Sequence, residues 1–357
     1  MDNLNQPRRR PLGYDGLKSV LKSMSVEKRW SFRQEVHNHL PTLRSINSLL
    51  PYTIENAIIW EDELHINRTK WAFRKNPEQS NPNDDDPNQT TISFFDHDSL
   101  KRCQEFRVNK TLDEAFEKCF NVYFKNGSNI QELDLSGVPK FLCDRDGSAD
   151  FKLNILSLST LSTTVDSFDS FIRFVNLDRL DHISLVLDGS EHGEELRMLE
   201  KPAIINCKNL DLEAYARRSL INFCTGLRNR NLVLNHNKFD VNDLRMLIEN
   251  WKTSDRPIGT CFCLLLCVDD MLHHLELQNT FPVEIQRDSI EIQGIGIKMD
   301  DNRDLVLYNG EHQVEEGAFA ALKMEVIASG SAKKIGDSEV SAKEADEGEP
   351  NEKRARQ

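Results

Sequence analysis

The sequence predicts an α/β fold: an irregular leucine-rich-repeat-like solenoid with parallel strands, preceded by a small helical module and closed by a β-meander. The first observation is a set of short apolar triplets whose first leucines are 23, 29, 25 and 22 residues apart. This spacing is typical of leucine-rich repeats, in which each unit is a short strand with a helical return. The second observation is that amphipathic helical segments separate the triplets, which favours parallel strands with helices on one face. The triplets are Leu133-Asp134-Leu135, Leu156-Ser157-Leu158, Leu185-Val186-Leu187, Leu210-Asp211-Leu212 and Leu232-Val233-Leu234.

The region before the repeats begins with a short polar and basic stretch, residues 1–10, which we expect to be disordered. Residues 11–51 carry the apolar spacing of short helices and are closed by a proline. A module of this size is too small to be stable alone, so we expect it to pack on the next part of the chain. One helical face is formed by Tyr14, Leu17, Val20, Leu21 and Met24, and another by Leu43, Ile46, Leu49 and Leu50.

Residues 52–75 alternate between apolar and polar side chains and predict strands. Residues 76–91 have a different character, because they contain three prolines and the acidic run Asp84–Asp86 with no apolar anchor. This composition predicts a flexible loop or linker.

Residues 92–258 form the predicted repeat-like α/β region. Its first helix has a clear start, because Thr111 is a good N-cap and Glu114 lies three residues further on, the pattern of a capping box. Asp166 and Asp240 are each expected to be the N-cap of a later amphipathic helix. Strand and helix signals therefore alternate through this region.

Beyond residue 258 the pattern changes. Residues 259–312 are predicted as a C-terminal β region, which starts with the apolar run Cys261–Val268, suited to a buried strand. The alternation slips by one residue at Gly294, which suggests a β-bulge. Residues 313–330 receive no assignment, and residues 331–357, which lack a core, are expected to form a disordered tail.

Composition and charge exclude several classes of partner. The chain has 357 residues and a net charge of −13, so we expect no nucleic-acid partner. No apolar run approaches the roughly 20 residues of a membrane span, and no secretory signal precedes the first helix, so we expect no membrane partner and a cytoplasmic location. The basic residues of Lys353–Arg356 leave a nuclear location open. The eight cysteines are then expected to be reduced.

The sequence predicts no catalytic residue, no cofactor site and no metal site, and therefore a protein that is not an enzyme. Cys261, Cys263 and Cys267, with His273 and His274 nearby, form the strongest metal candidate. Zinc ligands, however, are spaced C-x2-4-C on a tight turn, whereas these cysteines lie in an apolar run. Buried structural cysteines are the better interpretation.

Several segments outside the leucine triplets have a distinctive sequence. They are Pro11–Leu21, Glu27–Arg29, Leu40–Ile46, Thr111–Phe116, Trp251–Lys252 and Arg256–Thr260. Over about residues 11–310, these segments resemble a nematode-expanded, F-box-related protein family. The resemblance is specific to the family and not to any chemistry. It implies a degenerate F-box-like module over residues 11–51, followed by a leucine-rich-repeat-like, F-box-associated region.

The resemblance implies a role as well as a fold. An F-box binds a Skp1-like adaptor, and the repeats behind it select a substrate for ubiquitination by an SCF-type ligase. Here Leu12, Leu17, Val20 and Leu21 could supply the apolar contacts to the adaptor. They could equally be the ordinary core of a small helical module.

We therefore expect a protein–protein interaction module whose binding surface is the strand face opposite the leucines. Its middle residues are small or acidic, which favours a partly basic partner. The alternatives are a repeat-type binding protein with no ubiquitination role and, less favoured, an enzyme. The residues expected on the binding face are Asp134, Ser157, Val186, Asp211 and Val233.

Overall fold

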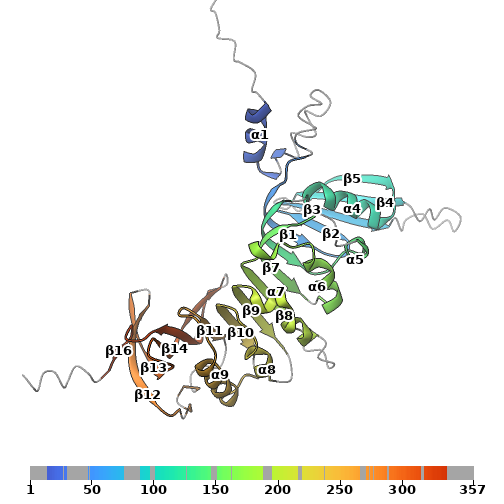
Figure 1. Ribbon diagram of the computed structural model, residues 1–357. Helices are drawn as coiled ribbons and strands as arrows, with labels where there is room; N and C mark the ends of the chain where they lie inside the picture. Colours follow the sequence, from blue (N-terminus) through green and yellow to red (C-terminus); the bar gives the residue numbers. More distant parts are fainter. Residues whose placement is uncertain are drawn as a thin grey trace, which may run out of the picture. The chain divides into compact units, whose positions relative to one another are not determined.

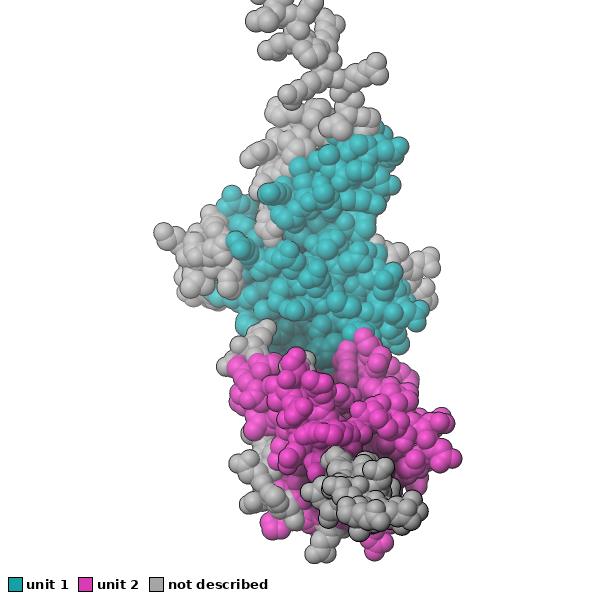
Figure 2. Space-filling view, turned by 90° about the vertical axis from the view of Figure 1, so that its left-hand side faces the viewer, with its two compact units in different colours: residues 1–186 teal, residues 187–357 magenta. Residues whose placement is uncertain are grey.

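The computed structural model (Figure 1) describes residues 14–26, 28–29, 47, 49–75, 89–96, 101–125, 127–145, 151–161, 163–187, 195–215, 219–236, 238–265, 271–272, 274–275, 277–287, 289–314 and 317–335. The chain divides into two compact units, residues 1–186 and residues 187–357 (Figure 2). Each unit is dominated by β-structure with parallel and antiparallel strands, so the predicted mixed α/β class is confirmed. Within the described residues, no helix has the length and apolar character needed to cross a membrane.

Some predictions lie outside the described residues. These are the disorder of residues 1–10 and 336–357, the adaptor contact of Leu12, most of the second half of the helical module, and the candidate metal ligands Cys267 and His273.

The first unit begins with helix α1 (Tyr14–Ser23), which carries the predicted apolar face. Leu21 is buried in a small cluster with Leu50, and Met24 packs against both. The helix is therefore held by contacts with the segment that leads into the first strand.

The sheet of the first unit combines two kinds of pairing. Its strand order is β8-β7-β6-β1-β2-β3-β4-β5. Strand β1 pairs in parallel with β6 and antiparallel with β2, so it joins a parallel half to an antiparallel half. The antiparallel strands are β1 (Thr53–Ile59), β2 (Glu63–Ile66), β3 (Thr69–Lys75), β4 (Gln89–Asp96) and β5 (Lys101–Asn109). The parallel strands that come after them are β6 (Asn129–Leu135), β7 (Asn154–Leu161) and β8 (His182–Leu187).

Strand β4 corrects one predicted boundary. It begins at Gln89, inside the segment 76–91 that we expected to be a loop. Thr90 and Thr91 are buried in it and pair with β3. Threonine is a good strand residue once a neighbouring strand covers it, and the sequence pattern does not reveal that neighbour.

The parallel strands place their apolar side chains in register. Leu133 of β6 pairs with Leu158 of β7, and Leu158 pairs with Ile183 of β8. The predicted phase of the second triplet is therefore wrong at its first leucine. Leu156 is 53% exposed, and the buried positions of β7 are Ile155, Leu158 and Thr160. Ile155 and Leu158 are both buried although they are three residues apart, so the regular alternation of buried and exposed residues is interrupted between them. An L-x-L motif alone therefore does not reveal which leucine faces the core.

The helices of the first unit follow the strands. Helix α4 (Leu112–Tyr123) has the predicted capping box between Thr111 and Glu114. Helix α6 (Val165–Ile172) differs from the prediction, because its N-cap is Thr164, whose hydroxyl accepts from the Ser167 amide, and Asp166 lies inside the first turn. Two shorter helical segments also lie in the connections between the parallel strands: α5 (Lys140–Asp144) and the 3₁₀ helix η1 (Leu177–Arg179).

The second unit also joins parallel to antiparallel strands, in the order β16-β12-β13-β14-β15-β11-β10-β9. Its parallel part consists of β9 (Asn209–Ala214), β10 (Asn231–His236) and β11 (Cys261–Leu265). The helical segments that connect its parallel strands are η2 (Glu195–Glu200), α7 (Pro202–Asn206), α8 (Ile221–Cys224) and α9 (Val241–Thr253). Asp240 caps α9, as the sequence predicts.

The closing β-meander extends further than the sequence indicated. It comprises β12 (Thr280–Arg287), β13 (Ile290–Lys298), β14 (Arg303–Val314), β15 (Gly317–Ala328) and the short β16 (Lys333–Lys334). The unassigned residues 313–330 are thus mostly strand, and β16 lies inside the segment expected to be a tail. Strand β15 joins the meander to the parallel strands through β11.

The predicted bulge at Gly294 is wrong. Strands β12 and β13 pair continuously from Thr280 opposite Ile297 to Arg287 opposite Ile290. The apparent phase change arises because Ile290 and Ile292 lie on one face of β13, whereas Ile295 and Ile297 lie on the other. Gly294 itself is closely packed: a Cβ there would lie 2.5 Å from the Leu307 carbonyl oxygen. A glycine is required here because the backbone of Leu307 comes too close for a side chain. Close approach of another backbone is, besides a bulge, a common reason for glycine within a strand.

Candidate functional site

The predicted binding residues of the first unit lie on the face of the parallel sheet that points away from the buried leucines. Asp134 pairs with Ile58 of β1 and Ser159 of β7. Ser157 and Val186 lie on the same face but in other cross-strand rows, because strand pairing places Ser157 opposite His182 and Val186 opposite Leu161. The structure thus brings all three residues to one surface without aligning them.

Asp134 is the most unusual group on this face. Its Oδ1 atom is buried and has no hydrogen-bond partner among the described residues, and the same holds for the Ser136 hydroxyl two residues later. Burial raises the pKa of the Asp134 carboxyl group. A buried acceptor without a donor is costly, so a donor supplied from outside would bind favourably here.

An aromatic and charged group lies on the same face of the sheet, two strands away from Asp134, and the sequence analysis missed it. His65 of β2 pairs with Ile58, which places it on the same face as Asp134. The His65 ring lies 5.3 Å from the ring of Trp60, which is 40% exposed. Glu63 binds Lys70 at 2.6 Å between carboxylate oxygen and Nζ. An exposed tryptophan directly after an apolar strand was the available signal.

Ser157 and His182 form a contact that could be taken for catalytic machinery. The Ser157 hydroxyl lies 2.9 Å from Nδ1 of His182, within reach of a nucleophile–base pair. Both residues, however, lie in paired strands, whose backbone amides are used by the parallel ladders and so do not form an oxyanion hole there. We interpret the contact as a cross-strand hydrogen bond.

In the second unit, Asp211, Val233 and Cys263 form one cross-strand row on the face opposite the leucines. Burial raises the pKa of the Cys263 thiol to about 12 and that of Cys261 to about 11. Thiols that stay protonated are poor nucleophiles and poor metal ligands. In the part of the chain that the structure describes, there is no group of three or more side chains able to hold a metal ion.

Asparagine side chains link successive segments of the parallel region, a feature that the sequence analysis also missed. In the first unit Asn176, which precedes η1, donates to Asn154 at 2.9 Å, and Asn154 donates to Asn129 at 3.2 Å. In the second unit Asn231 donates to Asn209 at 2.6 Å. The recurring asparagine before an apolar strand was the signal that could have revealed this ladder.

The residues expected to contact an adaptor do not form one exposed patch. Of the three that the structure describes, Val20 is exposed, Leu17 is half-buried and Leu21 is buried against Leu50. Leu21 is therefore a core residue of the helical module. Tyr14, on the same helix, is exposed and was not among the expected contacts.

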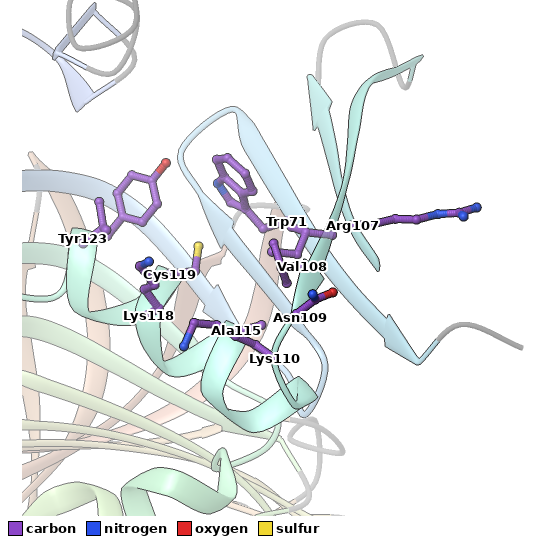
Figure 3. Close-up of a pocket in the computed structure, with 11 residues that line it drawn as sticks. Trp71, Arg107, Val108, Asn109, Lys110, Ala115, Lys118, Cys119 and Tyr123 are labelled. Carbon is purple, nitrogen blue, oxygen red and sulfur yellow. The ribbon is translucent and has the colours of Figure 1, made fainter. Parts of the chain in front are cut away.

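A pocket of about 610 Å³ lies beside α4 in the first unit (Figure 3). Its walls come from α4 and from strands β3, β4 and β5. Cys119 lines this pocket and is only half-buried. Burial of the sulfur atom raises the pKa of the Cys119 thiol far above its usual value, so the thiol is neutral.

Part of the chain is similar to a known protein domain. Residues 111–267, which include α4 and the strands β6 to β11, match a family model described as a domain of unknown function (DUF3557). No curated protein matches the chain.

Proposed function

We propose that this chain is a protein-binding module and that its binding surface is the open face of the parallel strands. The observation that carries the proposal is that, among the described residues, neither the buried Oδ1 atom of Asp134 nor the buried Ser136 hydroxyl has a hydrogen-bond partner. A partner that inserts a lysine or arginine side chain would supply the missing donors and compensate the carboxylate charge. Trp60, exposed at the edge of the same face, would add the kind of aromatic contact that is common at interfaces.

The repeat-like architecture belongs to the same proposal. In the second unit Leu210 pairs with Leu232, and Leu232 with Phe262, which repeats the in-register stacking of the first unit. Short helices or 3₁₀ turns return the chain between these strands. We infer a diverged leucine-rich-repeat-like solenoid, an architecture that presents an extended surface to protein partners.

The test is affinity capture by the full-length chain carrying Asp134→Lys and Asp211→Lys, quantified against the unsubstituted chain. A partner that uses the open faces should be lost. The matched control is Asp178→Lys with Glu200→Lys, since these acids are exposed and lie in the returns. Equal recovery from both double variants would reject the open faces as the binding surface.

A second candidate is the ubiquitin-ligase adaptor role, which rests on the F-box resemblance. Its support in the structure is that Val20 and Tyr14 of α1 are exposed apolar residues, available for a helix-in-groove contact. Purified Skp1-like adaptor should bind the full chain and lose affinity for the Val20→Asp variant but not for Lys22→Asp. Absence of binding to the unsubstituted chain would leave a repeat-type binding protein with no ubiquitination role.

We propose no enzymatic activity, cofactor or metal, and neither a nucleic-acid nor a membrane partner. A cytoplasmic site of action, with the nucleus as the alternative, accords with a net charge of −13 and with reduced cysteines.

A further inference from the structure

We propose that the pocket beside α4 is a binding site for a small amphipathic anion, with an apolar body and a carboxylate head group. This site is separate from the open sheet face and does not depend on the function proposed above. It rests on the shape of the cavity and on the distribution of charge along its walls.

The walls of the pocket are largely apolar. One wall is a stripe of α4 at helical spacing, and the other is formed by neighbouring strands. Aromatic packing fixes the base, because Trp71 lies 4.7 Å from Phe94 and 6.4 Å from Tyr123, measured between ring centroids. The apolar lining consists of Ala115, Cys119 and Val122 from α4, and Trp71, Ile92 and Val108 from the strands.

A separate stripe of the same helix holds it in place. Phe116 stacks on Phe73 of β3 with 4.9 Å between ring centroids, and Phe120 packs edge-on against Phe141 at 5.4 Å. Helix α4 is therefore anchored by its aromatic side chains, while its smaller residues leave the space beside it open. Such a pre-formed cavity needs little rearrangement to accept a ligand.

The charged residues of the lining are Arg107, Lys110 and Lys118, and no aspartate or glutamate among the described residues contributes to it. This bias is notable in a chain of net charge −13. In Figure 3 the Arg107 side chain extends away from the group formed by Trp71, Cys119 and Tyr123, so the two lysines are the cations available to a ligand. The backbone of Lys110 is fixed, because its carbonyl oxygen accepts from the Thr90 hydroxyl at 2.8 Å.

Cys119 contributes apolar, polarisable surface to the lining of the pocket. A volume of about 610 Å³ is within the range of pockets that enclose a drug-sized molecule. The apolar lining accepts the body of the ligand, and the two lysines accept its carboxylate.

The test is titration calorimetry of the full-length chain with dodecanoate below its micellar concentration. Three probes separate the contributions: acetate carries the head group alone, dodecanol the tail alone, and dodecyltrimethylammonium the same tail with the opposite charge. We expect saturable 1:1 binding of dodecanoate, weaker binding of dodecanol, and none of acetate or the cation. Equal binding of the three dodecyl compounds would overturn the proposal, because it would reveal nonspecific apolar adsorption.

Substitutions then locate the site. Lys110→Ala and Lys118→Ala should each lower the affinity for dodecanoate about threefold to tenfold, with little effect on the affinity for dodecanol. The control Lys140→Ala removes an exposed lysine of α5 that lies outside the pocket. Val122→Phe should fill the cavity and weaken the binding of both dodecanoate and dodecanol. Asp134→Lys, on the open sheet face, should change neither affinity. Unaltered dodecanoate affinity in the Lys110/Lys118 double variant would rule this pocket out.

Discussion

Arg29 donates a hydrogen bond from Nε to Oδ1 of Asn47, over 2.9 Å, and both side chains are buried. The same guanidinium donates to the backbone carbonyls of Leu50 and Pro51 and lies 3.9 Å from the ring centroid of Tyr52. Burial lowers the pKa of Arg29. The hydrogen bonds of the planar Arg29 guanidinium, called the Arg29 fork below, thus hold the helical module against the segment that leads into β1.

The first prediction concerns this fork. Arg29→Lys should lower the free energy of unfolding by about 2 kcal/mol, because lysine keeps the charge but cannot reach several acceptors in one plane. Urea denaturation followed by circular dichroism measures the change. Lys28→Ala, at the exposed neighbouring position, serves as the control and should have little effect. Equal losses for both variants would contradict a structural role for the fork.

The second prediction concerns the start of α4. Thr111→Ala should destabilise the first unit by about 1 kcal/mol, because the Glu114 amide loses the hydroxyl that caps it at 3.3 Å. Thr111→Ser should retain most of the stability, since serine also caps. If alanine and serine behaved alike in thermal unfolding, the capping box would not contribute.

The third prediction concerns pH. Because burial raises the pKa of Asp134, this group contributes stability that is fully present below the unfolded pKa, about 3.9, and is lost as pH rises through the folded pKa. Asp134→Asn should therefore gain stability at pH 7, by less than about 1 kcal/mol because water screens a half-exposed group. The gain should disappear near pH 3. Urea unfolding at both pH values, with Asp178→Asn as control, tests this; a gain that persists at pH 3 would refute it.

The fourth prediction concerns the meander of the second unit. A Cβ at Gly296 would clash with the ring of Phe281 and lie 2.8 Å from Cγ1 of Val283. Gly296→Ala should therefore destabilise this unit by about 1–3 kcal/mol through overpacking. At Gly310 the nearest atom would be 3.5 Å away, an ordinary contact, so Gly310→Ala is the matched control. Similar melting temperatures for the two variants would argue against close packing at Gly296.

Local signals in the sequence account for much of the secondary structure. The capping boxes that begin at Thr111 and Asp240 are present, because a cap requires only residues within one helical turn. Leu210 and Leu232 face the core as expected. The errors have a common cause: the phase of Leu156 and the role of Gly294 depend on strands that are distant in the sequence.

The candidate sites were predicted less completely. The choice of Asp134, on the face opposite the leucines, followed from strand alternation alone. Trp60 and His65 could not be assigned to this face in the same way, because they come from another part of the chain and share the face with Asp134 only through the pairing of β1. The pocket beside α4 was equally hidden, since helical periodicity does not distinguish a residue that faces a core from one that faces a cavity.

The sequence by itself determined the mixed α/β class, the alternation of strands and helices between residues 111 and 251, and the acidic character of the chain. These features depend on side-chain periodicity and composition, which act over a few residues. The tertiary structure decided which polar atoms are left without partners, where the lysines of the pocket gather, and how Arg29 reaches Asn47. Those features depend on cross-strand register and on the placement of helices against the sheet, because a buried group takes its character from neighbours that are remote along the chain.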